Sequence, residues 1–310
     1  MRQSLFKMNI NSIFRNQVQN MIPMRQLFTI LLIALFQINT VSAQEQQASP
    51  KDDDIIKVLA IGNSFSEDAL ENYLYEMAKA ANKKIVIGNL YIGGAPLSLH
   101  LKNAHNNNKA YNYRKISLDG TKTKTDKVSI EEALADDNWD YVSLQQASPL
   151  SGKYSVIMET LPDVWTYVFA HIHPDTKLVY HQTWAYQKDS KHEGFKNYNQ
   201  DQIVMYDSII NATSQIDKSG DFSFVVPSGT AIQNARTSSI GDHFTRDGYH
   251  LDLDYGRFTA AATWYAKLFN LDPRKNSYKP EKLTDLQAKI AKQAAQKAVK
   301  KPFKISRIKL

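Results

Sequence analysis

The 310-residue chain contains no cysteine. This absence excludes disulfide bonds, thiolate metal sites, a cysteine nucleophile and a lipid-modified cysteine behind a leader. No Gly-x-Gly-x-x-Gly or Walker-type loop occurs either, so the sequence predicts no nucleotide cofactor. Internal repeats are also lacking. With 43% hydrophobic and 22% charged residues, the composition is that of a globular protein and excludes a disordered or fibrous chain.

A long apolar run is missing as well, because the stretch 27–36 near the N-terminus is too short for a comfortable transmembrane span. It follows a positive start at Met24 and leads to a small-residue site ending at Ala43, the pattern of a secretory signal peptide. We expect residues 1–43 to be this signal, 44–54 to be a polar linker, and the mature protein to be periplasmic or secreted without stable membrane insertion. The alternative is an uncleaved anchor.

The formal net charge of +7 comes mainly from the C-terminal stretch 282–309, in which Asp285 is the one acid. Such a stretch would suit a nucleic acid or an anionic surface. It lacks interleaved aromatic residues apart from Phe303, and the protein carries an export signal. We therefore expect no nucleic-acid partner, and interpret the stretch as a solvated amphipathic helix with a loose end.

Short apolar segments alternate with helical periodicity along the middle of the chain, which predicts parallel strands covered by helices on both faces. The expected strands are 55–61, 84–92, 141–144, 177–183 and 223–227. The expected helices are 66–82, 129–136, 158–171, 200–216, 255–269 and 283–299. The fold class is α/β: a three-layer α/β/α sandwich with a mainly parallel five-stranded, flavodoxin-like sheet over 55–272. The polar stretches 103–127 and 187–199 are expected on the active-site rim, and 273–310 as an appendage.

A serine stands where the first strand ends. The apolar run 58–61 breaks at Gly62, and Ser64 opens the following helix. Helix N-terminal N–H groups favour developing negative charge, and sites in such sheets lie beyond the carboxyl ends of the strands. Ser64 is therefore a candidate nucleophile. In the alternative reading it caps the helix in a capping box with Glu67, although Ser66 could equally be the cap and leave Ser64 free.

A base for this serine is found near the other end of the chain. A serine hydroxyl is a poor nucleophile until a neighbouring base takes its proton. His250 is the candidate base, and Asp247, three residues earlier, can reach the other ring nitrogen. That contact would fix the tautomer and stabilise the imidazolium. A lone histidine would more often be an ordinary loop residue, so the argument depends on the combination with Ser64.

Three segments together resemble the SGNH (GDSL-like) hydrolase superfamily, and more narrowly an uncharacterised exported branch of it. They are Gly-Asn-Ser-Phe-Ser at 62–66, Asn-Leu-Tyr-Ile-Gly-Gly-Ala at 89–95 and Asp-Gly-Tyr-His at 247–250. The first has asparagine where the superfamily has aspartate. The resemblance implies that the backbone N–H groups of Ser64 and Gly94 form an oxyanion hole.

One block departs from that superfamily. After the third strand its members have Gly-x-Asn-Asp, whose asparagine completes the oxyanion hole, whereas this chain has Gln-Gln-Ala-Ser at 145–148. By spacing, the asparagine position is Ala147, which has no side-chain donor. We expect Gln145, rather than Gln146, to supply the donor, as a glutamine does in some relatives similar to sialate acetylesterases.

Other polar and aromatic residues have competing interpretations. Gln182 and Trp184 lie at the end of the fourth strand and are expected to hold a sugar ring, although aromatic residues at a strand end are more often packed. The histidines at 171 and 173, and at 100 and 105, lack the further ligands of a zinc site, so no metal is expected.

Together these features predict an exported serine esterase that removes acyl groups, such as acetyl, from a glycan or another small ester, without a cofactor. Two alternatives stay open. The missing asparagine would also fit a glycan-binding protein that has lost efficient catalysis. An acyltransferase would use the same acyl-enzyme.

Overall fold

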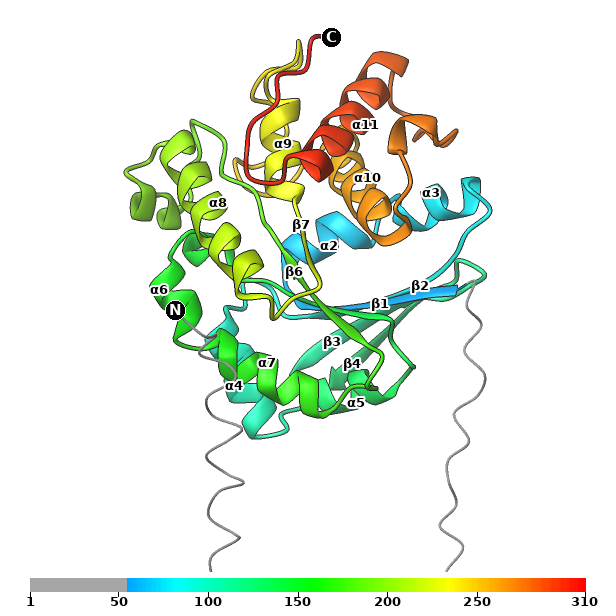
Figure 1. Cartoon of the computed structure of the whole chain (residues 1–310), viewed down its shortest axis with the longest axis vertical. Helices are drawn as coiled ribbons and strands as arrows, with labels where there is room; N and C mark the ends of the chain where they lie inside the picture. Colours follow the sequence, from blue (N-terminus) through cyan, green and yellow to red (C-terminus); the bar gives the residue numbers. More distant parts are fainter. Residues whose placement is uncertain (1–54) are drawn as a thin grey trace, which may run out of the picture. The chain divides into compact units, whose positions relative to one another are not determined.

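A computed structural model describes residues 55–310, so the expected signal peptide and linker lie outside the described residues. The sheet has seven strands in the order β4-β3-β2-β1-β5-β6-β7 (Figure 1). The strands are β1 (Ile55–Gly62), β2 (Lys84–Tyr91), β3 (Tyr111–Ile116), β4 (Lys122–Val128), β5 (Tyr141–Leu144), β6 (Lys177–His181) and β7 (Phe224–Val226). The five expected strands are all present and run parallel, while β3 and β4 are antiparallel additions.

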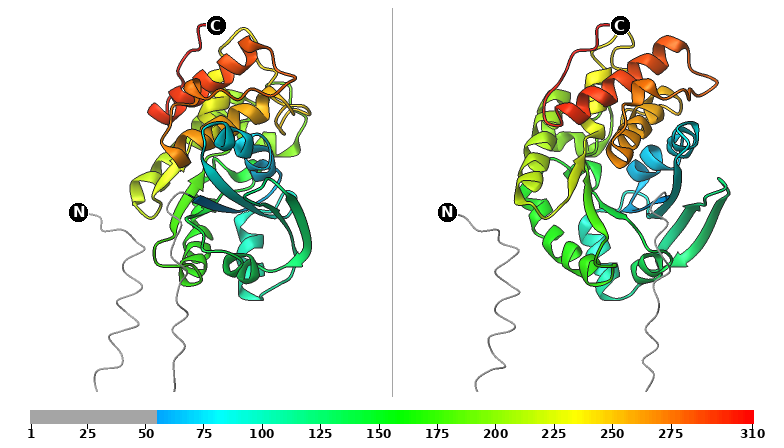
Figure 2. Two further views of the ribbon diagram at one scale, coloured as in Figure 1. Left: turned by 90° about the vertical axis from the view of Figure 1, so that its right-hand side faces the viewer. Right: turned by 45° about the vertical axis from the view of Figure 1, so that its right-hand side comes forward.

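Helices cover both faces of the sheet, which confirms the predicted three-layer α/β/α class (Figures 1 and 2). One face carries α2 (Ser64–Leu70), α3 (Leu74–Ala80), α9 (Ser228–Ala235), α10 (Tyr255–Phe269) and α11 (Asp285–Lys300). The other carries α4 (Leu97–His105), α5 (Ile130–Ala135), α6 (Tyr154–Met158) and α7 (Leu161–Ala170). Helix α8 (Gln202–Ser219) contributes side chains to both apolar cores. Short 3₁₀ helices are η1 (Ser148–Leu150), η2 (Glu193–Tyr198) and η3 (Pro273–Lys275).

The apolar strands are explained by burial on both sides. In β1, Val58 and Ala60 belong to the core beneath α2 and α10, whereas Leu59 and Ile61 belong to the core on the opposite face. Successive side chains of a strand point to opposite faces, so a strand covered on both sides must be apolar at consecutive positions. This is why β1 has a continuous apolar run and no polar alternation.

The polar stretch 103–127 was expected on the active-site rim, and this expectation was wrong for most of it. The chain completes α4 there and then forms the hairpin of β3 and β4, which extends the sheet beyond β2. Six consecutive residues of β4, Lys122–Lys127, are exposed. Lysines suit such an edge because they discourage pairing with another chain. A polar strand of this kind lacks the apolar signal by which the other strands were predicted.

The expected helix 66–82 is broken in the middle. α2 ends at Leu70, and α3 begins after Tyr73, whose φ of 68° is left-handed. The break lets α2 stay short above the end of β1. None of the helices in residues 55–310 is long and apolar enough to cross a membrane.

The C-terminal stretch is part of the main fold and not the appendage expected for 273–310. Residues 55–310 belong to one compact unit. Ile290, Ala291 and Ala294 of α11 are fully buried in the core shared with α9 and α10. The basic residues of this stretch are exposed, apart from Lys292 and Lys297, which are half-buried.

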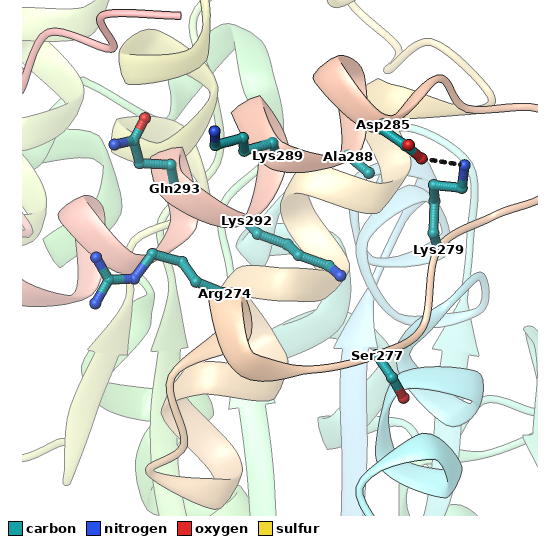
Figure 3. A pocket seen from close by; sticks show the side chains of 8 residues that line it. All are labelled: Arg274, Ser277, Lys279, Asp285, Ala288, Lys289, Lys292 and Gln293. Atoms are coloured by element: carbon teal, nitrogen blue, oxygen red, sulfur yellow. Dashed lines mark hydrogen bonds and ion pairs between the residues drawn. The ribbon is translucent and has the colours of Figure 1, made fainter.

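Four of those basic residues line a cavity of about 480 Å³ between η3 and α11: Arg274, Lys279, Lys289 and Lys292 (Figure 3). Lys279 pairs with Asp285 at 2.6 Å, and the Lys292 ammonium donates to a backbone carbonyl. None of the residues predicted for catalysis lines this cavity.

Candidate active site

Ser64 is the first residue of α2 and does not cap it. The cap is Asn63, whose side-chain oxygen accepts a hydrogen bond from the Phe65 N–H at 3.0 Å. Ser66 donates its hydroxyl to the Asn63 carbonyl at 2.7 Å. Both capping interpretations, with Ser64 or with Ser66, were therefore wrong. Because the Asn63 side chain caps the helix, the Ser64 hydroxyl is available for another partner.

That partner is His250. Its Nε2 lies 2.8 Å from the Ser64 hydroxyl, and its Nδ1 lies 2.6 Å from an Asp247 carboxylate oxygen. The other Asp247 oxygen accepts the backbone N–H of His250 at 2.7 Å. Gly248 lies between them at a φ of 91°, which a residue with a side chain rarely adopts. Asp247 and His250 were predicted from their spacing of three residues. The turn brings His250 to Ser64, which lies 186 positions earlier in the sequence.

The electrostatics of this chain of hydrogen bonds keep Asp247 charged. Partial burial opposes ionisation, but the hydrogen bonds from the His250 ring and from the backbone of His250 and Tyr249 outweigh it and lower the Asp247 pKa. An ionised carboxylate at Nδ1 requires the proton to lie on that nitrogen. The Nε2 of His250 is then free to accept the serine proton.

The loop that carries His250 is held by Asp68, a fully buried carboxylate on α2. Asp68 pairs with Arg246 at 3.1 Å and with Arg257 at 2.7 Å, and it accepts the Leu251 N–H at 2.8 Å. It lies one helical turn after Ser64, so a single short helix positions both the hydroxyl and the loop of the candidate base.

Gly94 lines the same pocket as Ser64. It has a φ of 68° in a turn closed by the Ala95 N–H donating to the Ile92 carbonyl at 3.2 Å. As the first residue of α2, Ser64 has no acceptor for its own N–H inside the helix. Ser64 and Gly94, whose N–H groups are expected to form the oxyanion hole, thus border one and the same pocket.

Gln145 does not reach this pocket, contrary to the expectation that it donates to an oxyanion. Its side chain is 1% exposed and is used twice, donating to the Asn63 side-chain oxygen and facing His181 Nδ1, both at 2.8 Å. Gln146 is also engaged, since its oxygen accepts the N–H groups of Ala147 and Leu97. Neither glutamine lines the pocket.

Gln182 and Trp184 are likewise buried, so the expected sugar platform does not fit their placement. Gln182 donates to Thr213 at 3.0 Å and accepts from Thr230. Trp184 stacks on Phe65 with ring centroids 4.2 Å apart and donates its indole N–H to the Tyr249 carbonyl at 2.8 Å. The alternative interpretation, packing at a strand end, describes both residues.

A family comparison adds to this geometry. Residues 57–298 match the model of a domain of unknown function, DUF4886. The chain belongs to this family. Among curated proteins, none matches the sequence.

Solved structures resemble this DUF4886 chain at two levels. A crystal structure of a DUF4886 family protein from Bacteroides uniformis has 50% identity and a TM-score of 0.81, covering 82% of this chain and 98% of that one. TesA has 10% identity and a TM-score of 0.41 over 71% and 98% of the two chains. An acetyl xylan esterase has 15% identity and a TM-score of 0.36 over 68% and 99%.

The pocket of the DUF4886 chain has a volume of about 360 Å³ and contains residues that the sequence did not single out. Tyr91, His192 and Tyr249 line it together with Ser64 and His250. His192 comes from the stretch 187–199 that was expected on the rim; burial and the nearby His250 lower its pKa. Tyr91 ends β2 and Tyr249 lies in the loop of His250, so both fall within segments that the sequence had indicated, but neither side chain had been assigned a role.

Two of the histidines weighed as metal ligands have other contacts. His100 lies 2.9 Å from the Tyr111 hydroxyl, and His171 lies 2.7 Å from a backbone carbonyl. Within residues 55–310, no group of three or more histidine, aspartate or glutamate side chains is arranged to hold a metal ion.

Proposed function

We propose that this protein is a serine hydrolase acting on carboxylic esters. The observation that carries the proposal is the continuous path Ser64–His250–Asp247, with atom separations of 2.8 and 2.6 Å, whose serine and histidine line a pocket. A nucleophile, a base and a group that orients the base within hydrogen-bond reach are the components of acyl transfer through a covalent intermediate.

The reaction follows from these positions. His250 takes the hydroxyl proton as the Ser64 oxygen attacks the ester carbonyl carbon, and the carbonyl oxygen gains the negative charge. The N–H groups of Ser64 and Gly94 stabilise that charge, each worth roughly 3 kcal/mol. His250 then passes its proton to the departing alcohol oxygen, leaving an acyl-enzyme. Water, deprotonated by His250, releases the acid and restores Ser64.

We propose that the substrate is a carbohydrate carrying a small acyl group such as acetyl, and that the protein encounters it outside the cytoplasm. The pocket supports a small polar ester because the groups that line it include Tyr91, Ser148 and Tyr249, which combine ring faces with hydroxyls. The signal-like pattern of residues 1–43 supports the location. No cofactor takes part in this scheme.

Hydrolysis of p-nitrophenyl acetate tests the proposal. We expect turnover by the wild type, and a decrease of at least about 10³-fold in Ser64→Ala. Ser208→Ala is the matched control, because this serine lies on α8 and its hydroxyl only donates to the Val204 carbonyl. A serine-directed phosphonate should label Ser64, as read by peptide mass spectrometry. Turnover that persists in Ser64→Ala would refute the proposal.

A glycan-binding protein without efficient catalysis is the second candidate, favoured by the burial of Gln145 away from the pocket. It predicts glycan binding by a protein that neither turns over esters nor reacts with the phosphonate. A transferase would instead be recognised by acyl transfer to an added sugar alcohol faster than to water.

A further inference from the structure

Four buried polar side chains form a hydrogen-bonded row across the carboxyl ends of neighbouring strands. Asn63 follows β1, Gln145 follows β5, His181 ends β6, and Ser228 follows β7 as the start of α9. Each of these four residues is at most 1% exposed. We call this row the buried relay. The chemistry proposed above uses none of its side chains directly, so their burial and pairing need another explanation.

The direction of every hydrogen bond in the buried relay follows from one backbone group. The Phe65 N–H can only donate, so the Asn63 atom that it meets must be the side-chain oxygen. The Gln145 atom 2.8 Å from that oxygen must therefore be its NH₂ group, and the other Gln145 atom is its oxygen.

That oxygen can only accept, so the Nδ1 of His181, 2.8 Å away, must carry a proton. Burial lowers the His181 pKa to about 3, which keeps the ring neutral. A neutral ring protonated on Nδ1 has a lone pair on Nε2. The Ser228 hydroxyl, 3.1 Å away, donates to it.

The far end of the buried relay reaches both sides of the proposed oxyanion hole. The Asn63 oxygen holds the first turn of α2, which presents the Ser64 N–H. The Asn63 amide donates to the Ala95 carbonyl at 3.0 Å, which holds the chain directly after Gly94. Asn63 thus contacts the chain next to each of the two backbone donors, and Gln145 fixes its orientation.

We propose that Gln145 and His181 are positioning residues, which act through Asn63 to hold the two backbone donors of the oxyanion hole in place before the substrate binds. This proposal rests on the proposed esterase function. The resemblance to the SGNH superfamily implies a third oxyanion donor at the carboxyl end of β5. In this chain the residue at that strand end, Gln145, instead helps to hold the other two donors. Contributions of this kind act on the transition state, because the negative charge on the carbonyl oxygen develops only there.

Gln145→Leu removes both hydrogen bonds while keeping a similar volume. We expect kcat on p-nitrophenyl acetate to fall by about 10- to 100-fold, with KM changed by less than about threefold. A fall in kcat/KM that comes from KM alone would overturn the proposal, as would an unchanged kcat.

His181 offers a conservative rescue. In His181→Asn the side-chain amide can occupy the place of Nδ1 and still donate to Gln145, whereas His181→Leu cannot donate. We expect His181→Asn to keep kcat within about threefold of the wild type and His181→Leu to lose about tenfold. Equal losses in both variants would indicate mere packing and overturn the relay.

His100 provides the matched control, since it is also fully buried and bonded to one hydroxyl but lies on α4, outside the pocket. His100→Leu should leave kcat unchanged even if it lowers stability. A loss of kcat in His100→Leu equal to that in His181→Leu would show that the losses reflect general destabilisation.

A measurement without turnover tests the same point. The ¹⁵N shifts of His181 in the wild type should show the neutral tautomer protonated on Nδ1, and an Nε2-protonated ring would overturn the relay. Failure of the proposed function is separable: it appears as absent turnover in the wild type and removes this proposal with it. Wild-type turnover that is unaffected in Gln145→Leu and His181→Leu overturns the positioning role alone.

Discussion

The two sides of the candidate active site are held by different kinds of interaction. On the serine side, neutral groups connect Asn63, Gln145 and His181 through hydrogen bonds in a fully buried row. On the histidine side, the loop of His250 is held by the charge of Asp68 between two arginines. Both arrangements reach α2, where Ser64 and Asp68 lie one turn apart.

The difference follows from where each side lies in the fold. The serine side is built on the ends of parallel strands, whose backbones already place the residues, so its side chains need only a few directional bonds. The histidine side is a loop with an isolated bridge between Thr245 and Leu251. A loop makes few backbone hydrogen bonds. Ion pairs to α2 therefore hold this loop in place, as the backbone hydrogen bonds of the sheet do for the serine side. Loss of charge should therefore affect the histidine side more than the serine side.

The largest effect should come from Asp247→Asn, which leaves the loop in place and changes the proton on His250. An amide at this position no longer requires a proton on Nδ1, so Nε2 is not held ready to accept from Ser64. We expect kcat to fall by about 10⁴-fold, with little change in stability. Initial rates between pH 6 and 9 measure this, and a loss below about tenfold would contradict the assigned role.

Asp68→Asn tests the charge that holds the histidine side. It leaves Arg246 and Arg257 without their buried partner, and breaking a buried pair in this way costs about 3–5 kcal/mol. We expect the urea midpoint and kcat to fall together, because the loop of His250 loses its anchor. Asp285→Asn, in the exposed pair with Lys279, is the control and should unfold at the wild-type urea concentration. An unchanged midpoint in Asp68→Asn would remove the distinction between the two sides.

Some residues of the site could be predicted from the sequence more easily than others. The spacing of Asp247 and His250 and the strand-to-helix break at Ser64 are local patterns, and the structure brings these residues together. Asp68 gave no such signal, because its arginine partners lie 178 and 189 positions away. A helix acid near a positive loop can be recognised only after the fold has joined them.

Gln145 shows a different limit. Its place at the end of the third expected strand was predicted correctly, but the direction of its side chain depends on His181 and Asn63, which come from neighbouring strands. The fold has a similar limit. The five parallel strands are apolar at most positions and were predicted, whereas the exposed β4 and the half-buried β3, which carries Asn, Arg and Lys between its buried residues, were missed. Burial on both faces, rather than strand formation itself, produces the pattern that a sequence reveals.

We expect acid to lower the stability of the fold through buried neutral histidines, one of which, His181, lies on the serine side of the site. Burial lowers the pKa of His181 to about 3 and that of His100, in the opposite layer, to about 4. The unfolded chain takes up a proton at each histidine below a pH of about 6.5, and the folded chain does not. Stability is therefore fully present above this pH and is lost as the pH falls toward the folded pKa values.

Between pH 6.5 and 5 we expect the free energy of unfolding to decrease by roughly 1.5 kcal/mol for each of the two histidines. Urea titrations at both values, on the wild type and on His181→Asn and His100→Asn, measure each share as a difference. If neither variant has a shallower pH dependence than the wild type, the two rings are not buried in their neutral form.

The smallest expected effect concerns Trp184, the contact between the two sides. Its ring stacks on Phe65 beside the serine, and its indole N–H holds the Tyr249 carbonyl in the loop of the histidine. Trp184→Phe keeps a stacked ring and removes the hydrogen bond, so we expect a loss of about 1–2 kcal/mol in unfolding free energy. Binding of soluble acetylated oligosaccharides, followed by calorimetry, should stay the same. A selective loss of sugar affinity without a loss of stability would return Trp184 to the role of a sugar platform.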